Sequence, residues 1–154
     1  MSVGYYEGGV YNNYWVLIFS YPENSHTEGY RQEVLNLVNA QRAKYGLTAL
    51  EMGDDALTAA AQTRAEEIAV VNSHVRPDGS KCFTVLKDYG VTDTPTGENA
   101  AWGSVSPEEV VNAWMNSEGH RANILNPEAR KMSVGYYYNS NSTWGHQWIQ
   151  IFTK

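Results

Sequence analysis

Cysteine is nearly absent from this sequence, because Cys82 is the only one among the 154 residues. A single cysteine excludes an intrachain disulfide, so a hydrophobic core must hold the fold together. A chain of this length can bury such a core in one domain and is too short for two ordinary domains. The cysteine count does not decide the compartment, since a cytosolic protein and a disulfide-free secreted bacterial domain both fit it.

Long apolar runs and an excess of positive charge are also lacking. The longest apolar run, residues 14–19, has the length and the aromatic, β-branched composition of a strand, so we expect no membrane span. The formal net charge of -6 argues against a nucleic-acid partner, which needs a basic surface. No basic stretch followed by an apolar one comes after Met1, so the signal of an exported protein would lie upstream of this sequence.

The most informative feature that is present is an internal repeat. Residues 1–6 and 132–137 share the sequence MSVGYY, and residues 14–19 parallel residues 147–152. In both places a polar connection rich in glycine, asparagine or serine joins the two halves, a pattern typical of a β-hairpin. The sequence therefore predicts an N-terminal hairpin that duplicates the C-terminal one.

This repeat predicts the domain organisation. Residues 1–20 are interpreted as the tail of a preceding, similar domain, residues 21–29 as a linker, and residues 30–154 as the main domain. Alternatively, the leading hairpin could add to a sheet edge or replace its equivalent in another copy. The expected state is thus a monomer or a hairpin-swapped homodimer.

Within the main domain, apolar spacing and capping residues predict helices before the final hairpin. Ser106, Pro107 and the two acids that follow are a strong helix start, and Asp54 or Asp55 is a candidate cap for an earlier helix. The expected helices cover residues 30–45, 54–71, 82–89, 107–119 and 121–125. Helices followed by strands indicate the α+β class.

Six short motifs then occur in an order that resembles one known family. They lie at residues 33–43, 73–79, 97–100, 114–125, 132–136 and 148–152. Together they resemble the CAP superfamily of cysteine-rich secretory, antigen 5 and pathogenesis-related proteins, in its disulfide-free bacterial branch. The resemblance implies a three-layer α/β/α sandwich with a central three-stranded antiparallel sheet, and an extracellular or cell-surface location.

The resemblance also implies a cleft formed by two histidines and two acids. His74, Glu98 and His120 match three of these positions, and Asn99 follows the acid directly. The fourth position is Ser117 here, where animal members carry an acid, and the neighbouring Glu118 is the alternative. His74 and His120 would be ligands for zinc or another divalent cation, with binding that weakens as pH falls and the histidines protonate.

The same residues also have structural interpretations. Glu98 could pin a loop by accepting backbone amides, and His120 and His74 could each complement a helix end. Cys82 is interpreted as a small apolar residue, so no nucleophile is predicted.

Three functions remain open at this point. The first is a binding domain for a divalent metal, a small ligand, a peptide or a cell-surface component. The second is a metal-assisted hydrolase of peptide or cell-wall substrates. The third is an adhesion or spacer module in a tandem array, which the repeat supports.

Overall fold

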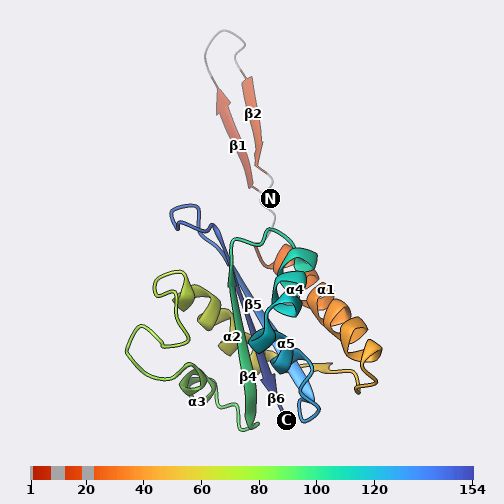
Figure 1. Cartoon of the computed structure of the whole chain (residues 1–154). Helices are drawn as coiled ribbons and strands as arrows, with labels where there is room; N and C mark the ends of the chain where they lie inside the picture. The colour runs from red at the N-terminus through yellow and green to blue at the C-terminus, as the bar shows by residue number, and fades with distance from the viewer. Residues whose placement is uncertain (1, 8–12, 19–22) are drawn as a thin grey trace.

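The chain folds into helices and a mixed sheet, as the predicted α+β class requires (Figure 1). The computed structural model describes the backbone of residues 2–7, 13–18 and 23–154, and side chains from residue 26 onward. The elements in chain order are β1 (Ser2–Glu7), β2 (Asn13–Ile18), α1 (Glu23–Lys44), β3 (Glu51–Met52), α2 (Asp55–Ile68), the 3-10 helix η1 (Cys82–Thr84), α3 (Val85–Asp88), β4 (Pro95–Trp102), α4 (Pro107–Asn116), α5 (Glu118–Ile124), β5 (Lys131–Tyr138) and β6 (His146–Thr153). None of the helices in this described part is long and apolar enough to cross a membrane.

The main sheet has four strands in the order β3-β5-β6-β4, where three antiparallel strands were expected. The fourth, β3, contributes two residues that pair in parallel with β5, which makes the sheet mixed. The prediction that strands follow all the helices is wrong, because β4 precedes α4. Its sequence, PTGENAAW, is poor in strand-forming residues, so pairing with β6 rather than local propensity sets its conformation.

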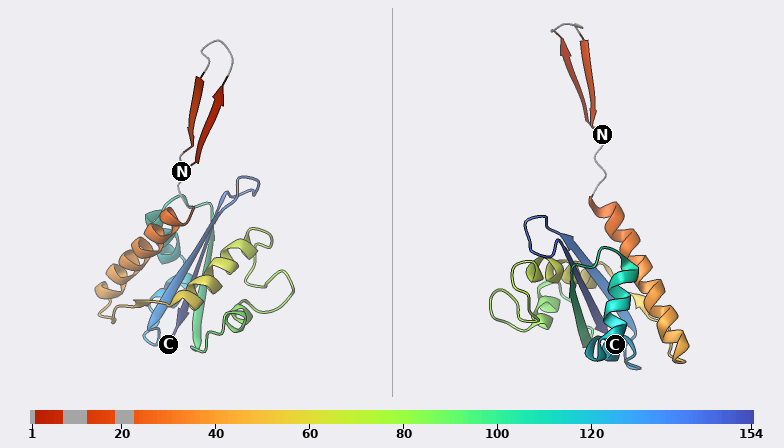
Figure 2. Two further views of the ribbon diagram at one scale, coloured as in Figure 1. Left: turned by 180° about the vertical axis from the view of Figure 1, so that it is seen from behind. Right: turned by 45° about the horizontal axis from the view of Figure 1, so that its top comes forward.

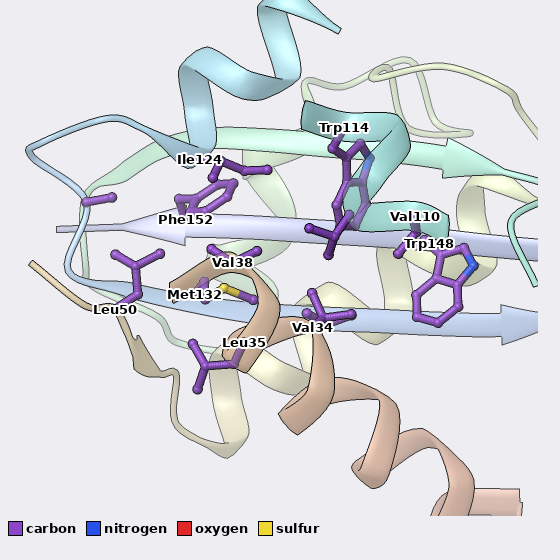
Figure 3. Packing of buried hydrophobic residues seen from close by; sticks show 13 residues of the cluster. Val34, Leu35, Val38, Leu50, Val110, Trp114, Ile124, Met132, Trp148 and Phe152 are labelled. Atoms are coloured by element: carbon purple, nitrogen blue, oxygen red, sulfur yellow. The ribbon is translucent and has the colours of Figure 1, made fainter. Parts of the chain in front are cut away.

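Helices cover both faces of this sheet (Figure 2). On β6, Trp148 and Phe152 pack against α1, α4 and α5, while Ile149 and Ile151 point to the other face and pack against α2 and α3. Figure 3 shows the first cluster, in which Trp114 lies with Trp148 in the core. Each fully buried large side chain contributes roughly 1.5–3 kcal/mol, so these two clusters fix the sheet between its helices.

Capping residues set the helix starts that the sequence predicted. The Asp54 carboxylate accepts a hydrogen bond from the Leu57 amide at 2.9 Å, and the Ser106 hydroxyl accepts one from the Glu109 amide at 3.3 Å. Several boundaries differ from expectation. Helix α4 ends at residue 116 instead of 119, α5 covers residues 118–124 instead of 121–125, and the expected helix at 82–89 is η1 followed by α3. Helix α2 ends at Ile68 instead of continuing to residue 71, and α1 begins at Glu23 instead of residue 30. Residues 23–29 of the expected linker are therefore helical, and residues 21 and 22 lie outside the described part.

Two pairs of antiparallel strands lie in the regions where the sequence predicts hairpins. Strands β1 and β2 make a sheet of their own, with Ser2 opposite Ile18 and Glu7 opposite Asn13. The expected first strand includes Met1, which is outside the described residues, as are 8–12 and 19–20. In Figures 1 and 2 this hairpin projects from the rest of the fold, whereas β5 and β6 lie at its centre.

Candidate functional site

Glu98 is a buried strand residue and not the loop residue that was expected. It lies in β4, and its side chain is 2% exposed. The Arg64 guanidinium of α2 donates to both carboxylate oxygens, from Nε to Oε2 at 2.9 Å and from an Nη to Oε1 at 3.2 Å. A carboxylate is costly to bury unless it is paired and hydrogen-bonded, so Arg64 is the reason Glu98 can lie here charged.

His74 also bonds to the Glu98 carboxylate. It lies in the loop after α2 rather than at the end of that helix, and its Nδ1 is 2.8 Å from Glu98 Oε1. The hydrogen bond to Glu98 raises the pKa of His74 against the opposing effect of partial burial. Burial raises the pKa of Glu98, but the hydrogen bonds from His74 and Arg64 outweigh it and lower that pKa overall. Because Nδ1 faces the carboxylate, a neutral His74 carries its proton there and has Nε2 as its acceptor.

Two arginines hold the loop that carries His74. Arg64 also donates to the Ser73 carbonyl at 3.1 Å and to Glu67 at 2.6 Å. Arg76, further along the loop, binds the same Glu67 at 2.7 Å. The His74 carbonyl accepts from the Cys82 amide at 3.1 Å. The histidine is therefore anchored through its backbone and its ring, while its side chain remains 54% exposed.

His120 lies in the first turn of α5, which corrects the expectation that it ends a helix. An imidazolium there would oppose the helix dipole, so the predicted capping role is wrong. Burial lowers the pKa of His120, and the positive charge of His74 lowers it further. Both effects favour a neutral His120, whose imidazole has one nitrogen that can act as an acceptor.

Asn99 fixes the position of His120 from the opposite face of β4. Its side-chain amide donates to the His120 carbonyl at 3.1 Å and to Gln150 Oε1 at 3.1 Å. Asn123 of α5 donates to Asn99 Oδ1 at 2.8 Å and also to the Glu98 carbonyl at 3.2 Å. Asn99 is therefore a structural link between α5 and β4, rather than a group that faces a ligand.

Ser117 and Glu118 stand apart from these contacts. Ser117 is the half-buried residue between α4 and α5, and Glu118 is exposed at the start of α5. Among the contacts described for these residues, neither side chain bonds to His74, Glu98 or His120. The structure thus brings His74 and Glu98 together with His120 nearby, and links neither candidate for the fourth position to them.

Few side chains near Glu98 are available to bind a metal ion. In the part of the chain that the structure describes, no three His, Cys, Asp or Glu side chains are arranged to hold a metal ion. Arg64 and His74 occupy the Glu98 oxygens, so the available donors are the two imidazoles. Cys82 is nearby, but burial, together with the Glu98 charge, raises the pKa of its thiol to about 11. It therefore stays protonated at neutral pH and is a poor nucleophile and a poor ligand.

The role of Arg64 as the buried partner of Glu98 was not predicted from the sequence. The signal for it was present: Arg64 falls on the same face of α2 as Leu57, Ala60, Ala61 and Ile68, all of which are buried. An arginine on an apolar helix face requires a buried partner.

Two hollows open elsewhere on the surface. One, of about 400 Å³, lies between the end of α2 and the β5–β6 connection and is lined by Val70, Trp144 and Gln147, among others. The other, of about 420 Å³, lies beside α3 and is lined by Phe83, Leu86 and Val91, among others. Neither includes the three candidate residues, which surround strand β4 at the edge of the sheet.

Comparison with known sequences gives one family and two curated relatives. The model of the cysteine-rich secretory protein family, CAP, matches residues 35–152. YkwD of Bacillus subtilis is 41% identical over 127 residues, covering 81% of this chain and 49% of YkwD. The Bacillus subtilis membrane protein YlbC is 33% identical over 115 residues, covering 71% of this chain and 33% of YlbC. The chain thus spans about half or less of the length of these relatives.

Solved structures share the fold. An extracellular SCP-domain protein of Bacillus anthracis superimposes with a TM-score of 0.74 at 24% identity, covering 92% of this chain and 46% of that protein. An outer surface protein of Borrelia burgdorferi gives a TM-score of 0.65 at 25% identity, covering 80% and 90%. Both of these neighbours are extracellular or surface proteins.

Proposed function

This chain belongs to the cysteine-rich secretory protein family, CAP, and on that basis we propose that residues 30–154 form an extracellular or cell-surface binding domain. In this proposal His74 and His120 bind a divalent cation such as zinc, and a small ligand, a peptide or a cell-surface component completes the site. The proposal includes the three-layer α/β/α architecture, for which helices on both faces of the sheet are the support.

The observation that carries the proposal is the contact between His74 and Glu98. A carboxylate that accepts from one ring nitrogen of a histidine orients the ring and increases the basicity of the other nitrogen, as in carboxylate–histidine–metal arrangements. Arg64 holds that carboxylate by two hydrogen bonds, so the exposed side of His74 is fixed before any ligand arrives. Glu98 acts in this scheme as an orienting group and not as a ligand.

The cation would be held by few protein atoms. Two imidazoles suit zinc and similar ions, and water or the ligand would fill the other coordination positions. A bound ion of this kind would supply positive charge to a carboxylate or carbonyl of the ligand. The proposal includes no covalent catalysis by Cys82, because its thiol stays protonated at neutral pH.

Zinc titration by calorimetry at neutral pH tests this proposal. We expect saturable binding to the full chain, and a loss of affinity of at least about tenfold in a His74→Ala, His120→Ala double variant. His146→Asn is the matched control, because His146 bonds to Tyr136 through Nδ1 and an asparagine can keep a hydrogen bond there. Absence of binding by the unmodified chain, or equal binding by the double variant, would refute the metal site.

A further inference from the structure

The two hairpins of this chain share their pairing register as well as their sequence. In β1–β2, Tyr5 lies opposite Trp15 and Gly4 opposite Val16. In β5–β6, Tyr136 lies opposite Trp148 and Gly135 opposite Ile149. Each residue of the first hairpin therefore has a counterpart at the same place in the second, although the connections differ in length. The duplication extends to the geometry of the strands.

Gly135 lies where the backbone of α2 closely approaches strand β5. A Cβ added at Gly135 would lie 1.9 Å from the carbonyl oxygen of Ala61, so a glycine is required there because the backbone of α2 lies directly on the strand. A glycine inside a strand otherwise weakens it. Gly4 occupies the same position in a hairpin that forms a sheet of its own. Its presence indicates that a helix of the α2 type packs on β1 as well.

Helix α2 of this chain is a poor candidate for the helix that packs on β1. Strands β5 and β6 already pack against α2 of this chain, and they would do the same in a second copy. The first hairpin is also a worse fit, because Leu17 stands where Gln150 accepts a hydrogen bond from buried Asn99. Displacing β5–β6 would remove one of the two acceptors of the Asn99 amide, leaving only the His120 carbonyl, and would cost roughly 1–3 kcal/mol.

We infer that β1–β2 is the closing hairpin of a second helical body of the same fold, which precedes residue 1 in a longer chain. That body would supply an α2-like helix to cover Gly4 and would lack a terminal hairpin of its own. Tandem bodies then follow each other closely, since α1 begins at Glu23, shortly after β2 ends at Ile18. A two-stranded hairpin alone is marginally stable in water, which gives β1–β2 a physical need for this partner.

An extended chain tests the inference. Residues 23–131 are placed directly before residue 1 of the full chain, so that Met1 takes the place of Met132. Amide hydrogen exchange then reports on residues 2–7 and 13–18. We expect protection below about tenfold in the 154-residue chain, a clear rise in the extended chain, and protection above about a thousandfold in the extended chain that also carries Leu17→Gln, because the hairpin is then part of a core without the Asn99 mismatch.

Two variants make the result specific. Gly4→Val in the extended chain should remove the protection of β1 and β2 and leave β5 and β6 protected. Leu17→Gln restores the acceptor for Asn99, so an unprotected hairpin in both the extended chain and its Leu17→Gln variant would overturn the inference. A dimer of the 154-residue chain whose β1 and β2 are protected, and which Gly4→Val dissociates, would also overturn it in favour of a second copy.

Discussion

Replacing Glu98 with glutamine should uncouple His74 from the core of the domain. The substitution keeps the size of the side chain and removes its charge. Arg64 donates to both oxygens of this carboxylate, and His74 donates to Oε1 as well. An amide has one acceptor oxygen and one donor nitrogen, so in either orientation one N–H of Arg64 would face the donor nitrogen of the new side chain, and in one of the two His74 would face it as well.

The cost can be worked out from the ion pair. Removing one partner of a buried pair costs about 3–5 kcal/mol, and both side chains here are at most 2% exposed. Arg64 keeps Glu67 at 2.6 Å and the Ser73 carbonyl, which limits the penalty. We therefore expect Glu98→Gln to lower the free energy of unfolding by about 3 kcal/mol, the lower end of that range.

The loss should depend on pH in a defined way. The pKa of His74 is raised above 6.5 in the folded state, so its stabilising effect is complete below 6.5 and is lost as pH rises through the folded value. The pKa of Glu98 is lowered below 4.5, so its effect is present above 4.5 and is lost as pH falls through the folded value. The difference between the two proteins should thus be largest between pH 4.5 and 6.5.

Urea unfolding at several pH values and NMR titration of the His74 ring measure the two effects. In the variant, the pKa of His74 should fall, because its hydrogen bond to a carboxylate is gone. Glu118→Gln is the matched control, since Glu118 is exposed and its loss should change stability by no more than about 0.5 kcal/mol. An unchanged His74 titration with a stability loss below about 1 kcal/mol would refute the role assigned to Glu98.

The remaining predictions concern packing around the sheet. Gly135→Ala should destabilise the fold by about 3 kcal/mol or more in thermal unfolding, since the new Cβ meets the Ala61 carbonyl, whereas Gly119→Ala, with open space around it, should not. Asn99→Ala should cost about 2–3 kcal/mol and speed amide exchange in α5, because it removes the hydrogen bond to the His120 carbonyl and leaves buried partners unpaired. Normal exchange in α5 of the second variant would contradict the link between Asn99 and His120.

The class and the helix caps could be predicted from the sequence because each has a local signature. Ser106 before proline and two acids is a helix start wherever it occurs. His74, Glu98 and His120 each lie in a short motif, and the match of the family model to residues 35–152 confirms the resemblance on which they rest.

What the sequence could not supply were contacts between distant segments. The glycine and asparagine that flank Glu98 indicate a loop, whereas pairing of β4 with β6 makes it a strand residue. The partner of Glu98, Arg64, is 34 residues away, and no local pattern connects the two. Gly119, which precedes His120, indicates that a helix ends there. In the structure α5 begins at Glu118, so both residues lie in its first turn.

Strand β4 lies at the edge of the sheet, yet it is not open along its length. Asn123 donates to the Glu98 carbonyl at 3.2 Å, and the Trp114 ring nitrogen donates to the Ala100 carbonyl at 3.4 Å. These two carbonyls are the groups that an incoming extended peptide would need for β-augmentation. If the proposed function holds, we therefore expect recognition beside His74 to use side chains rather than added backbone pairing, and the same two contacts make edge-to-edge pairing less favourable at this part of β4.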